Sequence, residues 1–166
     1  VVALLGTATA FIVGFKNAQT YSRTVEAQHV WSAIASASRY WGTVSRDFPT
    51  NPRSTRTLVR RHLAWLTVLR YQLREPRIWE SVTSRANTEY RRKFYSIPET
   101  ESPLEVELAK YLPEDELVRV MATKNKGSWL IGAQSATIRD MFAHQELAVL
   151  HHTEMQKTLK DFLDQQ

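Results

Sequence analysis

Cysteine is absent from this chain of 166 residues, and glycine occurs only five times. Without cysteine there is no disulfide, no thiolate zinc site and no thiol nucleophile. The six prolines are widely spaced, and no stretch alternates β-branched with polar residues as half-buried strands do. Long helices broken at a few places fit this composition. The sequence therefore predicts an all-α protein, of single-domain length, whose long helices form a helical bundle.

The sequence also lacks the common signatures of enzymes. It contains no Gly-rich phosphate loop, no arrangement typical of a catalytic triad and no paired-carboxylate site. These absences predict a protein that is not an enzyme and that uses no cofactor.

Charged residues are missing from residues 1–15, and Lys16, Arg23 and Glu26 then follow on the same helical pattern. An apolar helix that leaves a bilayer and meets its first basic residues at the exit has this profile. The run is shorter than the roughly 20 residues that span a bilayer, so a buried core helix is an alternative. A signal peptide fits poorly, because no positive residue precedes the run. Since the chain does not begin with Met, we expect a truncated transmembrane helix.

The net charge of +5 hides a strong asymmetry. Residues 53–93 hold eleven Arg or Lys against three Glu, and residues 99–116 hold seven acids against Lys110. A basic block and an acidic block can pair within the fold or across a subunit contact. A basic nucleic-acid-binding helical domain is an alternative. It is not favoured, because few aromatic residues interleave the run at residues 53–61 and no helix-turn-helix signature accompanies it, so we expect no nucleic-acid partner.

Apolar spacing and proline positions place the expected helices. They lie at residues 1–46, 56–75, 103–112, 113 to about 124, 128–144 and 146–166, with a partly helical segment at 76–94 and a loop at 96–103. Ser54 or Thr55 is expected to cap the second helix, and Arg60, Arg61 and His62 are expected on its polar side. The buried positions expected in the second helix are Leu58, Val59, Leu63, Leu66, Leu69 and Leu73. Those expected in the last helix are Leu147, Leu150, Leu159, Phe162 and Leu163.

A segment at the end of the uncharged run resembles a known family. The chain reads G-F-K-N-A-Q-T-Y-S-R-T-V-E from Gly14 to Glu26, which is similar to the inner end of the second transmembrane helix of bestrophins, a family of pentameric ion channels. The matching positions are Gly14, Phe15, Asn17, Tyr21, Arg23 and Glu26. The pattern departs from the family where Thr24 and Val25 replace its paired tryptophans, and Lys16 replaces an arginine.

The resemblance implies a function and a site. Residues 1–15 would be the inner part of a pore-lining transmembrane helix, and residues 16–166 a cytoplasmic helical domain. In the family, three side chains one turn apart line the narrow neck of the pore, and they correspond here to Thr7, Phe11 and Phe15. Five copies of the chain would form rings that gate ions by dewetting, although Thr7 stands where the family usually has an aliphatic residue.

The same resemblance implies partners and a second constriction. The partners would be further copies of the chain, inorganic ions and the cell membrane, and the signature residues Gly14, Asn17, Tyr21, Arg23 and Glu26 would be structural. A cytoplasmic constriction would fall between Leu147 and Met155. The alternative for Phe11 and Phe15 is an ordinary place in the core of a soluble helix.

Two histidine motifs suggest a metal site, and neither is favoured. Glu26 and His29 form an E-x-x-H, a spacing that lets one helix face hold a metal, but a di-iron bundle needs a second such motif and the sequence has none. A soluble metal-binding bundle is therefore kept only as an alternative that is not favoured. His151 and His152 are adjacent on a helix and point about 100° apart, so we expect a solvated face there and no metal.

Overall fold

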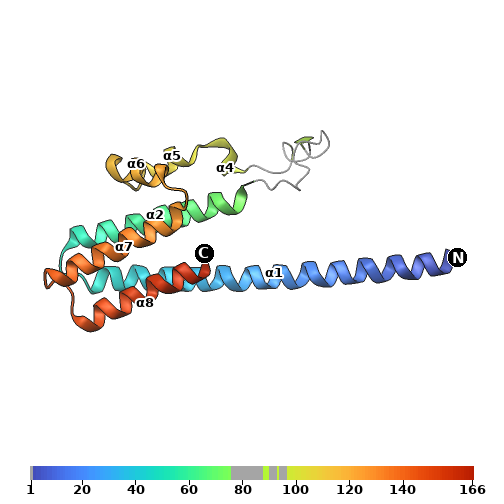
Figure 1. Cartoon of the computed structure of the whole chain (residues 1–166), viewed down its shortest axis with the longest axis horizontal. Coiled ribbons are helices and arrows are strands. Elements are labelled where there is room, and N and C mark those ends of the chain that lie inside the picture. Colours follow the sequence, from blue (N-terminus) through green and yellow to red (C-terminus); the bar gives the residue numbers. More distant parts are fainter. Residues whose placement is uncertain (1, 76–87, 90–92, 94–96) are drawn as a thin grey trace.

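The computed structural model describes residues 2–75, 88–89, 93 and 97–166. Its dominant element is α1 (Val2–Asp47), a continuous helix whose N-terminal half extends alone beyond the rest of the chain (Figure 1). Helix and connecting loops account for the whole of these described ranges, with no strand. The all-α prediction is confirmed, as is the single helix expected over residues 1–46.

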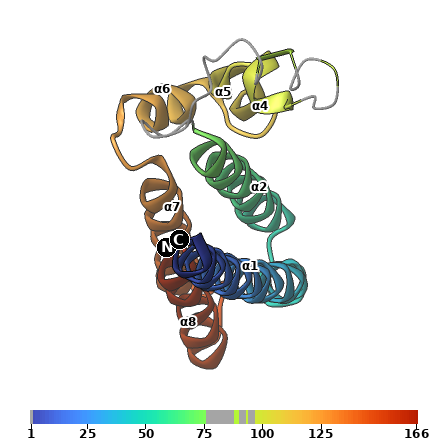
Figure 2. The ribbon, with the colours of Figure 1, turned by 90° about the vertical axis from the view of Figure 1, so that its right-hand side faces the viewer.

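The C-terminal part of α1 packs into a bundle with three other helices. These are α2 (Pro52–Arg74), α7 (Lys126–Ala143) and α8 (Val149–Gln165). Helix α7 lies between α2 and α8, and α1 contacts both α2 and α8 (Figure 2). The free half of α1 is therefore held in place from one end only.

Three short helices cover α2 and α7 on the side away from α1. They are α4 (Pro98–Glu101), α5 (Leu104–Leu108) and α6 (Glu114–Ala122). Contacts of α5 with α2 and of α6 with α7 seal the end of the bundle core around the buried residues Leu108, Leu112 and Val120. Helix α4 lies within the loop predicted at 96–103, while most of the segment predicted at 76–94 lies outside the described residues.

Large apolar side chains from every long helix fill the core. Trp41 of α1, Trp65 of α2 and Phe162 of α8 are almost completely buried, and Phe162 contacts Trp41 edge-on and Trp65 in a tilted arrangement. Burial of such large rings contributes the largest share of hydrophobic stabilisation per residue. The other fully buried large side chains are Leu58, Leu108, Leu130, Ile138, Met155, Gln134, Val44, Val68 and Val120.

The start of α2 differs from the prediction. Asn51 is the N-cap, and its side-chain oxygen accepts a hydrogen bond of 3.0 Å from the Arg53 amide, with Pro52 at the first helical position. Proline suits that position because its missing N–H needs no partner there. Neither Ser54 nor Thr55 is the cap: both lie inside the helix, where the Ser54 hydroxyl donates to Glu146 instead.

Several predicted faces are also wrong. His62 is buried rather than on the polar side of α2. Arg61 is partly buried and only Arg60 of that group is exposed. The structure also exposes four leucines that the helical spacing had placed in the core, which are Leu63, Leu73, Leu150 and Leu163.

Candidate pore-lining helix and its supporting bundle

The free half of α1 has almost no neighbours among the described residues of the chain. Phe11 and Phe15 are 75% and 63% exposed, and Ile12 and Val13 on the other side of the helix are exposed as well. Ile34 is the first buried residue of α1. The alternative, in which Phe11 and Phe15 are core residues of a soluble helix, requires both to be buried. The described residues do not bury them.

Thr7, Phe11 and Phe15 share one face of this half-helix. Side chains four residues apart stand above one another on an α-helix, and α1 is unbroken across these positions. Apolar residues surround the helix at this level, because Ile12 and Val13 point elsewhere. A helix that is apolar on every side normally has neighbours on every side.

The signature residues on either side of Phe15 are exposed too. Gly14, Asn17, Tyr21, Arg23 and Glu26 all lie on the solvent-facing surface of α1. Arg23 and Glu26 lie three residues apart on α1, but they form no ion pair with each other in the structure. Instead, both line a hollow of about 300 Å³ at the point where α1 meets the ends of α2 and α8, beside Trp31 and Leu73.

The base of α1 is held by two polar contacts as well as by its core residues. The Tyr40 hydroxyl donates a hydrogen bond of 3.0 Å to a carboxylate oxygen of Glu154 on α8. That hydrogen bond raises the pKa of Tyr40, because the phenol is favoured as a donor to the carboxylate. On the other side, the Ser38 hydroxyl lies 3.0 Å from Nε2 of His62 on α2.

His62 itself is enclosed by aromatic rings. Its ring centroid lies 4.7 Å from that of Phe162 and 5.4 Å from that of Trp65, and its Nδ1 has no hydrogen-bond partner among the described residues. Burial lowers the pKa of His62 to about 4, because the charged form would lose its hydration. The imidazole is therefore neutral near pH 7. Its spacing of three residues from Trp65 was a signal that could have placed it in the core.

A second exposed apolar pair lies at the corner between α7 and α8. Val149 and Leu150 are 65% and 80% exposed, whereas Leu147 and Met155 on either side are buried. His151 stacks on Phe48 with centroids 4.0 Å apart, and His152 lies 4.7 Å from the ring of Phe142. Both histidines are thus half-buried against separate rings, so the fully solvated face predicted for them is only partly correct.

The alternative sites predicted from sequence find little geometry to support them. Glu26 and His29 are exposed on the isolated half of α1, and the described residues contain no group of three or more potential metal ligands. None of the helices in the described ranges has both the length and the apolar character that a membrane crossing requires.

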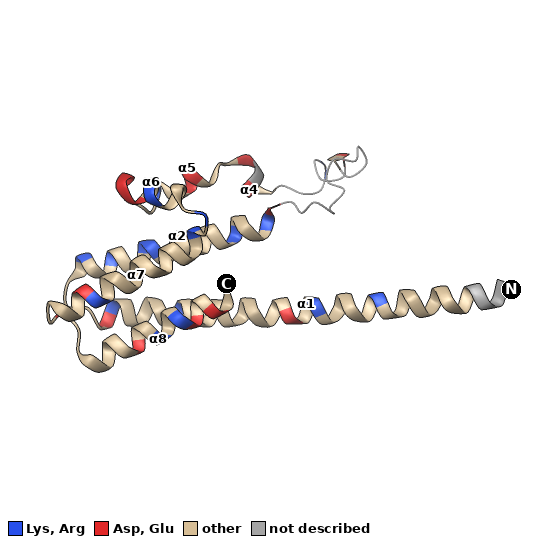
Figure 3. Cartoon of the chain, viewed as in Figure 1, with Lys and Arg blue, Asp and Glu red and all other residues tan. Residues whose placement is uncertain are grey.

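The sequence predicted that the basic and acidic stretches pair either within the fold or across a subunit contact. In the structure they pair within the fold (Figure 3). The Arg61 guanidinium forms a bidentate ion pair with Glu116 of α6, and Arg70 lies 2.7 Å from Glu99 of α4. The acidic segment therefore packs along the basic helix α2, which reduces the basic surface open to a nucleic acid.

Comparison with known proteins agrees with this architecture. The family model described as Bacterial/Fungal Bestrophin protein matches residues 1–166. The voltage-dependent anion channel-forming protein YneE, from Salmonella typhi and from Salmonella typhimurium, is 27% identical over 154 residues, which cover 86% of this chain and 41% of that protein. The chain thus spans less than half the length of these curated relatives.

Solved structures show the same fold. A crystal structure of a bacterial bestrophin homologue from Klebsiella pneumoniae, carrying a point mutation, superposes with a TM-score of 0.76 at 21% identity and covers 98% of this chain and 52% of that one. A second mutant of the homologue gives a TM-score of 0.74 at 20% identity over the same shares of both chains. With its full length matched by the family model and its fold shared with these structures, the chain belongs to the bacterial and fungal bestrophin family.

Proposed function

We propose that this chain is part of a subunit of an ion channel that conducts ions passively through the central pore of a pentamer. Family membership and the channel-forming name of the Salmonella relatives support this function. The observation that carries it is the free N-terminal half of α1, where Phe11 and Phe15 are exposed and which extends beyond the other described helices. Further copies of the chain would supply the missing neighbours.

In this proposal α1 divides at Phe15. Residues 1–15 form the inner part of a pore-lining transmembrane helix, and residues 16–166 form a cytoplasmic helical domain. Thr7, Phe11 and Phe15 face the pore axis, while Ile12 and Val13 pack against neighbouring helices. Rings of phenylalanine narrow the water column, and an apolar constriction gates by dewetting. The hydroxyl of Thr7 keeps its level of the neck wetter.

A second constriction fits the corner between α7 and α8. Of the apolar side chains between Leu147 and Met155, Val149 and Leu150 are the exposed pair. The start of α8, where they lie, is at the opposite end of the long axis from the N-terminus of α1 (Figure 1). The stacking of His151 on Phe48 ties this corner to the end of α1. In a pentamer around an axis along α1, these residues would form a cytoplasmic ring.

Ion flux through the full-length protein in liposomes tests the proposal. The double variant Phe11→Ala/Phe15→Ala widens the neck and removes its dewetting barrier, so conductance or open probability should rise. The control variant Val106→Ala/Val118→Ala, at exposed positions of α5 and α6 on the side away from α1, should leave conductance unchanged. Absence of flux from the unmodified protein, or equal flux from the double variant, would rule out this role for the two residues.

A further inference from the structure

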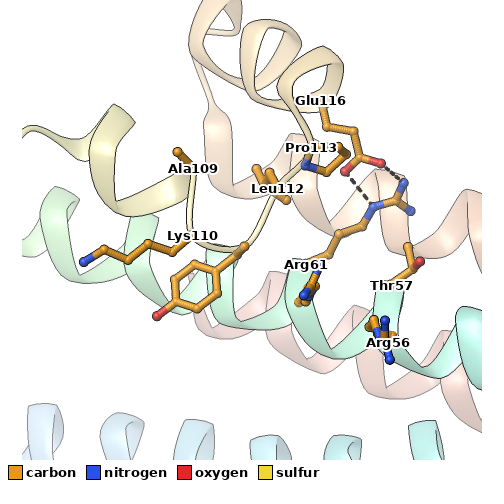
Figure 4. A pocket seen from close by; sticks show the side chains of 10 residues that line it. Arg56, Thr57, Arg61, Ala109, Lys110, Leu112, Pro113 and Glu116 are labelled. Atoms are coloured by element: carbon orange, nitrogen blue, oxygen red, sulfur yellow. Dashed lines mark hydrogen bonds and ion pairs between the residues drawn. The ribbon is translucent and has the colours of Figure 1, made fainter.

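A basic hollow lies on the opposite side of α2 from α1. Its volume is about 270 Å³, and it opens between α2 and the turn that joins α5 to α6 (Figure 4). Arg56, Arg60 and Arg61 contribute from α2, and Lys110, Tyr111 and Glu116 from the facing wall. It is separate from the proposed pore.

Regular structure fixes both walls of the hollow. Arg56 and Arg60 lie four residues apart on α2, so their side chains leave the same side of the helix, whereas Arg61 leaves about 100° further round and reaches Glu116 on the facing wall. On the facing wall, the amides of Tyr111 and Leu112 both donate hydrogen bonds of 2.9 Å to the Leu108 carbonyl. Leu108 and Leu112 are buried in the core, which holds this wall against α2.

Arg61 is held rigidly at the base of the hollow. Its guanidinium donates to both carboxylate oxygens of Glu116, to the Ala133 carbonyl at 2.9 Å and to the Thr137 hydroxyl at 2.5 Å. Figure 4 shows it reaching across the hollow to Glu116. The single carboxylate of the lining is therefore already neutralised, and it does not compensate the other cations.

Of the other three cationic side chains that line the hollow, one has an acidic partner and two have none among the described residues. Lys110 pairs with Glu107 at 2.6 Å, outside the lining. Arg56 and Arg60 form no ion pair and no side-chain hydrogen bond with any described residue. Two guanidinium groups with ten N–H donors between them thus border a hollow that holds no free carboxylate, and a bound anion would relieve their repulsion.

We propose that this hollow binds a dianionic phosphate group through Arg56 and Arg60. Guanidinium forks match the oxygens of a phosphate in bidentate geometry. The volume of the hollow suits a phosphate or a small phosphomonoester rather than a large cofactor. The source of the group is either a soluble phosphate compound or the headgroup of a phosphatidate.

Calorimetric titration of the full-length protein tests this site in three arms. The probes are inorganic phosphate, glycerol 3-phosphate, and phosphatidylcholine vesicles that contain phosphatidate, all at a salt concentration that screens exposed charges. Saturable binding in at least one arm, with one site per chain, is the expected result. The arm that binds identifies the source.

Two double variants that remove the same charge distinguish specific binding in the hollow from nonspecific attraction of anions to a basic surface. The variant Arg56→Gln/Arg60→Gln should weaken binding roughly tenfold or more, because each lost charge-assisted hydrogen bond is a large fraction of the affinity. The control Arg53→Gln/Arg74→Gln removes the same charge from exposed positions of the same helix and should bind normally. All four arginines are exposed, so both variants should fold, as circular dichroism will verify. No saturable binding in any arm, or equal weakening in both variants, would overturn the proposal.

Discussion

His62 lies where α1, α2 and α8 meet, and it is one of few polar side chains inside the aromatic cluster. Nothing among the described residues is placed to stabilise a charge on it: Ser38 offers one hydroxyl, and Trp41, Trp65 and Phe162 surround the rest. An imidazolium here would be both desolvated and unpaired. The contact that joins the base of α1 to α2 therefore depends on a neutral histidine.

Acidification should consequently destabilise the fold through His62. Its pKa is about 4 in the folded chain and 6.5 when unfolded, so the unfolded state takes up the proton first as the pH falls. Stability is fully present above about pH 7 and is lost as the pH falls toward 4, by about 3 kcal/mol at the lower end. Chemical denaturation at a series of pH values measures this.

The variant His62→Phe isolates that contribution, because it retains an aromatic ring but cannot titrate. Between pH 7 and 4.5 it should lose less stability than the unmodified protein. Replacing the exposed His29 by Gln should leave the pH dependence as it was. Identical pH curves for His62→Phe and the unmodified protein would show that His62 does not titrate in this way.

Like His62, Arg61 should make a large contribution to the free energy of unfolding, through its ion pair with Glu116. Its side chain and that of Glu116 are each 14% exposed, so removing the guanidinium leaves a carboxylate largely shielded from water. Arg61→Ala should lower the free energy of unfolding by about 2–3 kcal/mol. Removing Arg139, whose ion pair with Asp140 is exposed, should cost less than about 0.5 kcal/mol. Equal effects of the two substitutions would contradict the structural role given to Arg61.

Among the elements, α1 combines two environments in one helix. Beyond Ile34 it is a core helix, with Trp41 and Val44 buried against the bundle, and before Ile34 it is exposed. Local propensity and the continuous hydrogen-bond ladder maintain residues 6–20, which are all exposed. Nearer Ile34, Arg23, Glu26 and Trp31 border the ends of α2 and α8. Threonines in this half bond back to the preceding turn, as Thr20 does to the Lys16 carbonyl at 2.9 Å.

Phenylalanine substitutions should reveal this division directly. Phe162→Ala removes a fully buried ring and should cost about 3–5 kcal/mol. The double variant Phe11→Ala/Phe15→Ala should cost far less, because pore-facing side chains lose few packing contacts when shortened. Thermal unfolding of the full-length protein compares them. A loss for the double variant as large as that for Phe162→Ala would mean that the two rings are core residues of the assembly.

The identity of the residue that caps the start of α2 can be tested by substitution. Asn51→Ala removes the oxygen that caps the Arg53 amide, so it should cost about 1 kcal/mol of stability. Thr55→Ala, at a position that the sequence pattern had suggested for the cap, should be nearly neutral. The reverse order of effects in denaturant titrations would show that the cap lies at Thr55.

At the scale of the whole molecule, the sequence predicted the helical class and most helix ends. Prolines are local signals, which is why the end of α1, before Pro49, and the start of α6, after Pro113, lie close to their predicted residues. The faces of α2 and α8 were less predictable: whether Leu63 or His62 is buried depends on where α1 and α8 lie, and helical spacing does not carry that information. Phe11 and Phe15 illustrate a further limit, since their proposed neighbours belong to other copies of the chain.

The central claim is that one face of α1 lines an ion pathway, and cysteine accessibility tests it most directly. The chain has no cysteine of its own, so Phe15→Cys introduces a unique thiol into the full-length protein once any cysteine outside these 166 residues has been replaced. A charged, water-soluble thiol reagent should react with it and change the current sharply, whereas Val13→Cys on the packed side should give no such change. A current that is unaffected when Phe15→Cys is fully modified, or that responds only to modification of Val13→Cys, would contradict the pore-lining role of this face.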